Sequence, residues 1–310
     1  MNIEKPKRDN TRASTDYTIL WNGLNWTAIE KVVNKLQSRI AKAILGGRIN
    51  HAKKLQYLLT KSFYARLIAV KRATSNKGKK TPGVDGEIWS TPGCKYKGAL
   101  KLSNKGYKAQ PLKRTFINKS NGKKRPLGIP TIYDRAMQAL YLLSLDPVSE
   151  TILDKTSFGS RRFRSCKDAS EYLFKLLHQK TSAKWVLEGD IKGCFDNISH
   201  KWLQENVVME KKILHQFLKS GYVYSNKLYP TVSGSPQGGV ISPAYANLTL
   251  NGLGDMLRNR YWKSKKGSVH RRHNKNKVNI TVYADDFIIT ANSKQQRNTC
   301  RNKYFDRRIP

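Results

Sequence analysis

Two aspartates stand side by side at positions 285 and 286, inside the apolar stretch 280–289 of an otherwise strongly basic chain. Alternating apolar residues on both sides predict two short strands joined by a tight turn at the Asp-Asp pair. Neighbouring carboxylates repel one another unless a cation lies between them, and Mg²⁺ prefers oxygen ligands. The pair alone therefore indicates either a divalent-metal site or an ordinary polar turn.

A third carboxylate, Asp190, ends the short apolar segment 185–191, which predicts a strand. A lone aspartate there is often only a capping or turn residue. Nucleotidyl transfer, however, requires two metal ions held by carboxylates from different elements. One ion lowers the pKa of the attacking 3′-hydroxyl and the other stabilises the leaving pyrophosphate. Asp190, Asp285 and Asp286 could supply such a site.

The charge of the chain predicts a polyanionic partner. Lys and Arg number 59 against 21 Asp and Glu, which gives a formal net charge of +38 over 310 residues. Such an excess gives sequence-independent affinity for phosphate backbones and favours nucleic acid over a membrane surface. The four cysteines, at positions 94, 166, 194 and 300, are too far apart for a Cys-x-x-Cys zinc pair or a dense disulfide framework.

No segment approaches the roughly 18 to 20 apolar residues of a spanning helix, and the N-terminus lacks the apolar core of a secretory signal. The frequent Lys and Asn residues indicate an A+T-rich genome such as that of an organelle. We therefore expect the protein in a chloroplast or mitochondrion, or in the cytoplasm of a bacterium.

Helical periodicity dominates the first third of the chain. It predicts one basic amphipathic helix over residues 29–44 and a second over 53–72. The segments 74–86 and 97–114 are rich in Lys and Gly and predict loops. Residues 115–117 and 127–129 flank a basic tip and predict a hairpin. The apolar pattern of residues 133–145 predicts a helix stopped by Asp146-Pro147.

The second half of the chain alternates short elements with loops. Ser199 is expected to cap a helix over residues 200–207, and Ser242-Pro243 is expected to start another that reaches residue 257. The stretch 258–277 predicts a positive loop with Tyr261 and Trp262 among its cations, which suits base stacking as well as phosphate contacts.

An ordered series of motifs runs along nearly the whole chain and resembles the reverse transcriptases encoded by group II introns, also called maturases. The matching segments after the basic N-terminal helices are GKKTPGVDG at 78–86, KRPLGIP at 124–130, SFG at 157–159, DIKGCFD at 190–196, SPQGGVISP at 235–243 and YADD at 283–286.

The resemblance implies an α+β fold of the right-hand polymerase type, without a thumb. Its antiparallel palm sheet, packed on helices, would carry Asp190, Asp285 and Asp286 as ligands of two Mg²⁺ ions. The implied divisions are a disordered basic tail (1–16), an N-terminal helical extension (17–86), fingers (87–182) and a truncated palm (183–310).

Four further residues match nucleotide-binding positions of that family. Phe195 resembles the bulky gate that clashes with a ribose 2′-hydroxyl, although its position also suits a core aromatic. Gln237 resembles the glutamine that contacts the incoming nucleotide. Lys119 and Arg125 resemble the cations of the fingers that hold the triphosphate.

The implied function is that of an RNA-directed DNA polymerase that also binds group II intron RNA and assists its splicing. Its partners would be intron RNA, a DNA primer or target, and deoxynucleoside triphosphates. An RNA-directed RNA polymerase is disfavoured because Phe195 stands where ribonucleotides would require a small or polar residue.

The end of the chain favours a second hypothesis, a non-catalytic splicing factor that binds intron RNA. The sequence stops 24 residues after Asp286, whereas the family continues through more palm and a thumb. We therefore expect a truncated or frameshifted reading frame, or one piece of a split protein.

Overall fold

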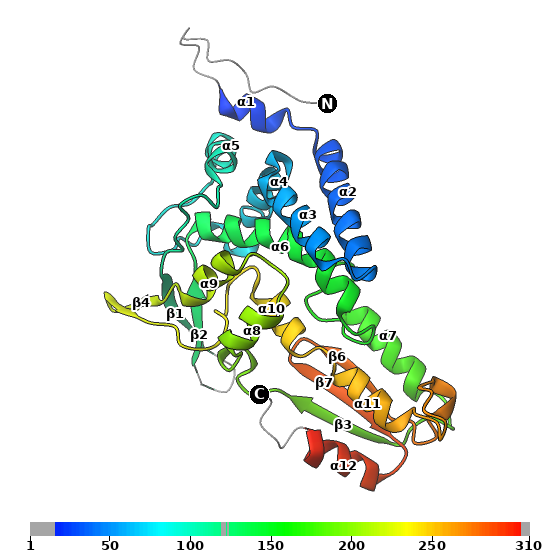
Figure 1. Cartoon of the computed structure of the whole chain (residues 1–310). Coiled ribbons are helices and arrows are strands. Elements are labelled where there is room, and N and C mark those ends of the chain that lie inside the picture. Colours follow the sequence, from blue (N-terminus) through cyan, green and yellow to red (C-terminus); the bar gives the residue numbers. More distant parts are fainter. Residues whose placement is uncertain (1–15, 119–121, 123, 305–310) are drawn as a thin grey trace.

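A computed structural model of the protein describes residues 16–118, 122 and 124–304. The predicted basic tail, residues 1–16, lies outside this part of the chain except for Asp16, and Lys119 lies outside it as well. Figure 1 shows a layer of N-terminal helices above one long central helix, with two small sheets on the opposite side of that helix.

The elements follow one another in an order that places most helices before the second sheet. The α-helices are α1 Tyr17–Asn22, α2 Trp26–Leu45, α3 Ile49–Lys61, α4 Phe63–Ala73, α5 Pro92–Lys101, α6 Ile132–Ile152, α7 Cys166–Leu177, α8 His200–Asn206, α9 Lys211–Lys219, α10 Ser242–Thr249, α11 Leu253–Tyr261 and α12 Lys294–Tyr304. The strands are β1 Leu112–Asn118, β2 Lys124–Ile129, β3 Trp185–Asp190, β4 Tyr222–Tyr224, β5 Lys227–Tyr229, β6 Asn279–Tyr283 and β7 Asp286–Ala291, and the 3₁₀ helices are η1 Lys77–Lys80, η2 Cys194–Asp196 and η3 Arg271–His273.

The N-terminal helices differ from the prediction at one point. The predicted single helix over residues 53–72 is two helices, because Ser62 adopts an extended backbone with ψ of 128° and separates α3 from α4. The change of direction lets each helix bury its own stripe: Leu55 and Leu59 from α3, and Leu67 and Val70 from α4. Both helices pack on α6. Residues 97–101 were likewise predicted as loop but complete helix α5.

Helix α6 does not stop at Asp146-Pro147, as the sequence had predicted, but continues to Ile152 with Pro147 inside it. Proline lacks the N–H that would bond to the carbonyl four residues earlier, which here belongs to Leu143. That carbonyl instead accepts a hydrogen bond of 2.6 Å from Nε2 of the buried Gln37 on α2. A side chain from the N-terminal layer thus replaces the missing donor.

We expect Gln37→Leu to lower the free energy of unfolding by about 1–3 kcal/mol, because it leaves a buried carbonyl without a donor. In a Pro147→Ala background the backbone N–H restored at position 147 can reach the Leu143 carbonyl, so the same substitution should cost less. Chemical denaturation of the four proteins measures this coupling. The exposed Gln179→Leu serves as a control, with an expected change within about 0.5 kcal/mol. Equal costs in both backgrounds would contradict the replacement of the donor.

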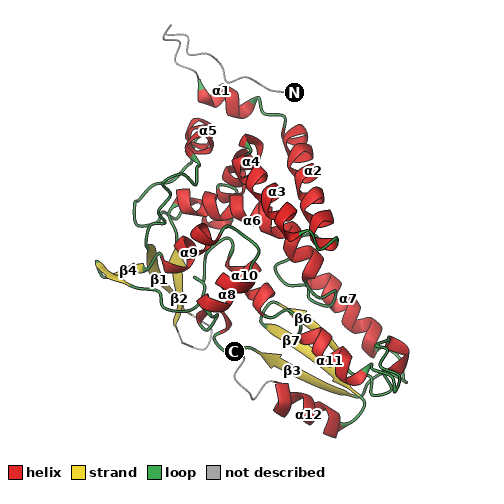
Figure 2. Cartoon of the chain, viewed as in Figure 1, coloured by secondary structure: helices red, strands yellow, loops and turns green. Residues whose placement is uncertain are grey.

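Two separate sheets lie below α6, coloured yellow in Figure 2. The first has the strand order β2-β1-β4-β5, in which β1 and β2 form the predicted antiparallel hairpin. The second is antiparallel throughout, with the order β3-β7-β6. Because helices and antiparallel sheets form separate layers rather than alternating, the fold is α+β, as predicted.

The β3-β7-β6 sheet has one buried and one open face. Ile280, Phe287 and Ile289 belong to a hydrophobic cluster that also contains Leu257 of α11 and Cys300 of α12. On β3 the exposed residues alternate with half-buried ones, so positions 186, 188 and 190 share the open face. No helix in the described part of the chain is long and apolar enough to cross a membrane.

Candidate active site

The three predicted metal-binding aspartates meet at one end of the β3-β7-β6 sheet. Asp190, the last residue of β3, lies directly opposite Asp286, the first residue of β7, in the antiparallel register. Directly opposite residues point to the same face, with Cα atoms roughly 4.5–5.5 Å apart. The N–H of Ile191 donates to the carbonyl of Asp285 at 3.2 Å, which fixes the hairpin turn against the end of β3.

The turn itself consists of Ala284 and Asp285, between Tyr283 at the end of β6 and Asp286 at the start of β7. The predicted Asp-Asp turn is therefore shifted by one residue, and the second aspartate belongs to the strand. Ala284 has a positive φ of 57°, which is uncommon for a residue other than glycine. Its strained backbone is held in place by the segment that precedes α7.

That segment, residues 156–159, runs alongside β6. Phe158 N–H donates to the Val282 carbonyl at 2.8 Å, and Val282 N–H donates to the Thr156 carbonyl at 2.9 Å. Gly159 then passes so close to the turn that a Cβ atom on it would lie 2.2 Å from the backbone nitrogen of Ala284. Asn247 of α10 holds the Gly159 carbonyl through a hydrogen bond of 2.9 Å. Both residues position the turn.

Negative charge accumulates at this end of the sheet. The pKa of the Asp286 carboxyl is raised above its ordinary value, first by partial desolvation and then by repulsion from Asp285, Asp190 and Glu188. Burial and the charges of Asp285 and Asp190 also raise the pKa of the neighbouring Cys194 thiol to about 11. The thiol therefore stays protonated at neutral pH, and a cation would relieve the repulsion among the carboxylates.

In the part of the chain that the structure describes, no three His, Cys, Asp or Glu side chains form a closed cluster that could hold a metal ion. The carboxylates are instead half-buried at Asp285 and exposed at Asp190 and Asp286. Mg²⁺ commonly binds through one or two carboxylates, while waters and substrate phosphates complete its coordination. This open donor set fits an ion that is shared with a nucleotide.

A glycine-rich loop, residues 233–240, connects the palm end of the site to the β1-β2 hairpin. Ser235 N–H donates to the Phe195 carbonyl at 2.7 Å, and Gly128 N–H donates to the Gln237 carbonyl at 2.8 Å. Gly238 needs its glycine, because it has a φ of 113° and a Cβ atom would lie 2.9 Å from the Gly128 carbonyl oxygen. The loop thus ties η2, which carries Phe195, to strand β2.

The structure also brings Arg125 and Gln237 together. Nε of Arg125 on β2 donates to Oε1 of Gln237 at 2.7 Å. Beside them lies a cavity of about 100 Å³ lined by Leu112, Arg114, Pro126, Gly128, Asp196, Thr231 and residues 233–237. Phe195 is half-buried against the main hydrophobic core. Of the four predicted nucleotide-binding residues, three therefore surround one region, and the fourth, Lys119, lies outside the described residues.

Comparison with known protein families places this arrangement. Residues 117–308 match the family described as "Reverse transcriptase (RNA-dependent DNA polymerase)", and residues 21–102 match "N-terminal domain of reverse transcriptase". This chain belongs to the reverse transcriptase family. The matched residues cover the β1-β2 hairpin, both sheets and all three aspartates, so the first sheet belongs to the fingers and the second to the palm of a right-hand polymerase.

Individual relatives support the group II intron branch of reverse transcriptases. The group II intron-encoded protein LtrA of Lactococcus lactis subsp. cremoris is 37% identical over 207 residues, which cover 64% of this chain and 34% of that protein. Protein YkfC of Escherichia coli is 32% identical over 268 residues, which cover 75% of this chain and 70% of that protein. The reverse transcriptase chain described here thus spans about a third of the length of LtrA. The bacterial sources are among those expected from the sequence.

Among solved structures, an RNA-dependent RNA polymerase, the 3Dpol of Sicinivirus, matches 74% of this chain and 51% of its own, with a TM-score of 0.40 and 13% identity.

Several residues of the reverse transcriptase site were not singled out from the sequence. Arg114 lines the cavity beside Gln237, and its guanidinium lies 3.9 Å from the ring centre of Tyr222. Asn247 and Gly159 hold the hairpin turn. The SFG motif at 157–159 marked this segment as characteristic of the family, but only the fold reveals its contact with the turn.

Proposed function

We propose that the chain is an RNA-directed DNA polymerase of the group II intron type. Asp190, Asp285 and Asp286 would hold two Mg²⁺ ions, and the partners would be an RNA template, a DNA primer and deoxynucleoside triphosphates. One observation carries the proposal: the register of β3 and β7 sets Asp190 directly opposite Asp286, next to Asp285 in the turn, on the open face of the palm sheet. The family match supports the same chemistry.

The proposed division of labour follows from position. When bound, the ions would supply a lowered pKa at the primer 3′-hydroxyl and stabilise the pyrophosphate leaving group. Arg125 would hold the triphosphate, with Lys119 of the same hairpin, and Gln237 would contact the incoming nucleotide. The hydrogen bond between Arg125 and Gln237 keeps both side chains oriented before a nucleotide arrives.

The same proposal extends to the rest of the chain. Helices in residues 17–86 would form the extension that binds intron RNA and assists splicing, residues 87–182 the fingers, and residues 183–310 the palm. A formal charge of +38 supports an RNA-binding role. Gln37 and Gln56 of the extension donate to the Leu143 and Ser144 carbonyls of α6, so the extension is anchored directly to the layer that supports the palm.

Primer extension on an RNA template tests the proposal. The chain should add deoxynucleotides to an annealed DNA primer in the presence of Mg²⁺, and a chelator should abolish the addition. Template binding, measured separately by fluorescence anisotropy, should weaken steeply with salt. Binding of the template without any extension would overturn the polymerase and leave the splicing factor as the function.

Phe195→Ala is expected to relax the choice of sugar. The half-buried ring sits on η2, immediately after the turn that follows Asp190, and its removal would open space for a 2′-hydroxyl. Ribonucleotide incorporation should then rise by about 10- to 200-fold relative to deoxynucleotide incorporation. Competition between the two nucleotide types in primer extension measures the ratio. An unchanged ratio in a folded variant would assign Phe195 to the core alone.

A further inference from the structure

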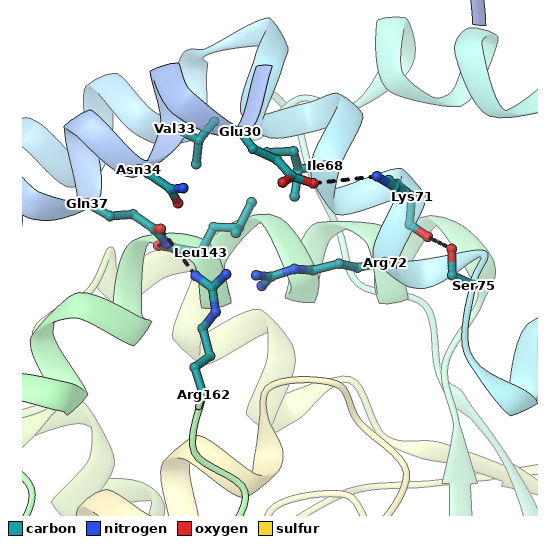
Figure 3. Close-up of a pocket in the computed structure, with 10 residues that line it drawn as sticks. All are labelled: Glu30, Val33, Asn34, Gln37, Ile68, Lys71, Arg72, Ser75, Leu143 and Arg162. Atoms are coloured by element: carbon teal, nitrogen blue, oxygen red, sulfur yellow. Dashed lines mark hydrogen bonds and ion pairs between the residues drawn. The ribbon is translucent and has the colours of Figure 1, made fainter. Parts of the chain in front are cut away.

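A second cationic cavity lies between the N-terminal helices and the palm, apart from the aspartates. It has a volume of about 280 Å³ and is lined by Glu30, Val33, Asn34, Gln37, Ile68, Lys71, Arg72, Ser75, Leu143 and Arg162. Its walls come from α2, α4, α6 and the loop before α7. Figure 3 shows the guanidinium groups of Arg72 and Arg162 pointing toward one another across the cavity.

Arg72 is unusually free for a half-buried arginine. Its Nη1 lies 3.6 Å from Oδ2 of Asp146, which is an ion pair too long for a hydrogen bond, and its side chain is 30% exposed. Arg72 donates no hydrogen bond to any described residue, and the buried Asp146 Oδ2 accepts none. Five donors at the edge of a cavity are therefore available to a ligand.

Adjacent arginines in the loop before α7 differ sharply. Arg161 is buried and bonds through both ends of its guanidinium to Glu150, at 2.9 and 2.7 Å, and further to the Asp154 and Ser157 carbonyls. Arg162, the next residue, donates a single bond of 3.3 Å to Oε1 of Gln37. Arg161 therefore anchors the loop, while Arg162 keeps most of its donors for the cavity.

An exposed aromatic ring adjoins the cavity. Phe163 is 95% exposed and adopts a left-handed backbone with φ of 59°. A backbone of this kind costs about 1–3 kcal/mol in a residue other than glycine, and packing of the exposed ring offsets little of that cost. The Arg162 guanidinium lies 5.2 Å from the ring centre. One guanidinium thus contacts both the ring and the cavity.

We propose that Arg72, Arg162 and Phe163 form a binding site for one nucleotide of single-stranded RNA. A backbone phosphate would lie between the two guanidinium groups, which match its geometry with bidentate hydrogen bonds. The unpaired base would stack on the Phe163 ring. The Asn34 amide lines the same cavity and offers a donor and an acceptor to a 2′-hydroxyl. The site rests on the proposed RNA-binding function and names where one segment of that RNA is held.

Two substitutions separate the phosphate contact from the base contact. With a short single-stranded RNA, followed by fluorescence anisotropy over a range of salt, Arg162→Gln should weaken binding about tenfold and make the salt dependence of log K shallower by about 0.7. Phe163→Ala should also weaken binding about tenfold but leave the salt slope unchanged. Arg162→Lys should keep the slope and lose part of the affinity, because the charge remains without the bidentate geometry.

Matched controls come from the same elements. Arg39 is exposed on α2, on the side of the helix away from Gln37, and Phe174 is a 66% exposed aromatic on α7. Arg39→Gln and Phe174→Ala should leave the affinity within about twofold of the wild type. Equal losses at Arg39 and Arg162 would overturn the site, since general surface charge would then explain the binding. Equal losses on single-stranded DNA would overturn the assignment to RNA.

The measurement needs neither Mg²⁺ nor nucleotides, so it is independent of polymerase activity. A chain that fails in primer extension but shows this pattern of binding would keep the site and lose the catalytic proposal. A chain that extends primers, with Arg162→Gln and Phe163→Ala binding RNA as the wild type does, would keep the catalytic proposal and lose the site. Thermal unfolding of each variant excludes loss of the fold as the cause.

Discussion

Asp190→Asn is expected to reduce primer extension by roughly 10³-fold or more while leaving RNA binding intact. Asparagine has the same size and keeps one oxygen, so the β3-β7 pairing survives, but the charge that would attract a divalent cation is lost. Rates of single-nucleotide addition on an RNA template measure the effect. Because Asp190 lies directly opposite Asp286, no other residue on β3 can take over its position.

Stability provides the readout that separates this role from a structural one. The raised pKa of Asp286, caused by desolvation and then by Asp285, Asp190 and Glu188, means that its ionised form is disfavoured in the folded state. Such a group reduces stability above its unfolded pKa. Removing the charge of Asp190 should therefore leave the free energy of unfolding unchanged or slightly increased at neutral pH. A structural aspartate would show the opposite.

Glu188→Gln is the matched control for Asp190→Asn. Glu188 lies two residues earlier on β3, shares the open face, and also repels Asp286, but its strand partner is Ile288 rather than an acid. Extension by this variant should stay within about twofold of the wild type. Equal losses in the two variants would mean that the whole negative face attracts cations, and the assignment of a specific ligand at Asp190 would fail.

Local patterns predicted much of the palm. Alternation around residues 280–289 predicted the hairpin of β6 and β7, and the apolar run that ends at Asp190 predicted β3. Ser199 caps α8 as expected, with its Oγ accepting from the Trp202 N–H. These features depend on neighbours in the sequence, so periodicity and capping chemistry suffice to detect them. The pairing of β3 with β7 came instead from the family resemblance.

Long-range contacts account for what the sequence did not predict. Pro147 is tolerated inside α6 because Gln37, 106 residues earlier than Leu143, supplies a donor. The cavity between Arg72 and Arg162 forms only because α4 and the loop before α7 meet across α6. A helix breaker and two arginines carry no local sign of such partners, since the compensating group lies on a different element.

The same reasoning makes Gly159 a sharp test of how the turn is positioned. Gly159→Ala would place a Cβ atom 2.2 Å from the Ala284 nitrogen and 2.7 Å from the Tyr283 carbonyl carbon. Both are backbone atoms and cannot rotate away, so the turn that carries Asp285 must shift. A displacement of about 1 Å can reduce catalysis by roughly 10²-fold, and overpacking should lower the free energy of unfolding by about 1–3 kcal/mol.

Single-nucleotide addition and chemical denaturation, both at a temperature where the variant is fully folded, separate these two effects. Gly46→Ala is the control, because a Cβ atom there would meet its nearest neighbour at 3.4 Å, an ordinary contact. It should alter neither quantity appreciably. If folded Gly159→Ala extends primers at the wild-type rate, the position of the turn does not limit catalysis. A large loss of rate in folded protein would instead mean that the segment before α7 sets the position of Asp285 through backbone contact alone.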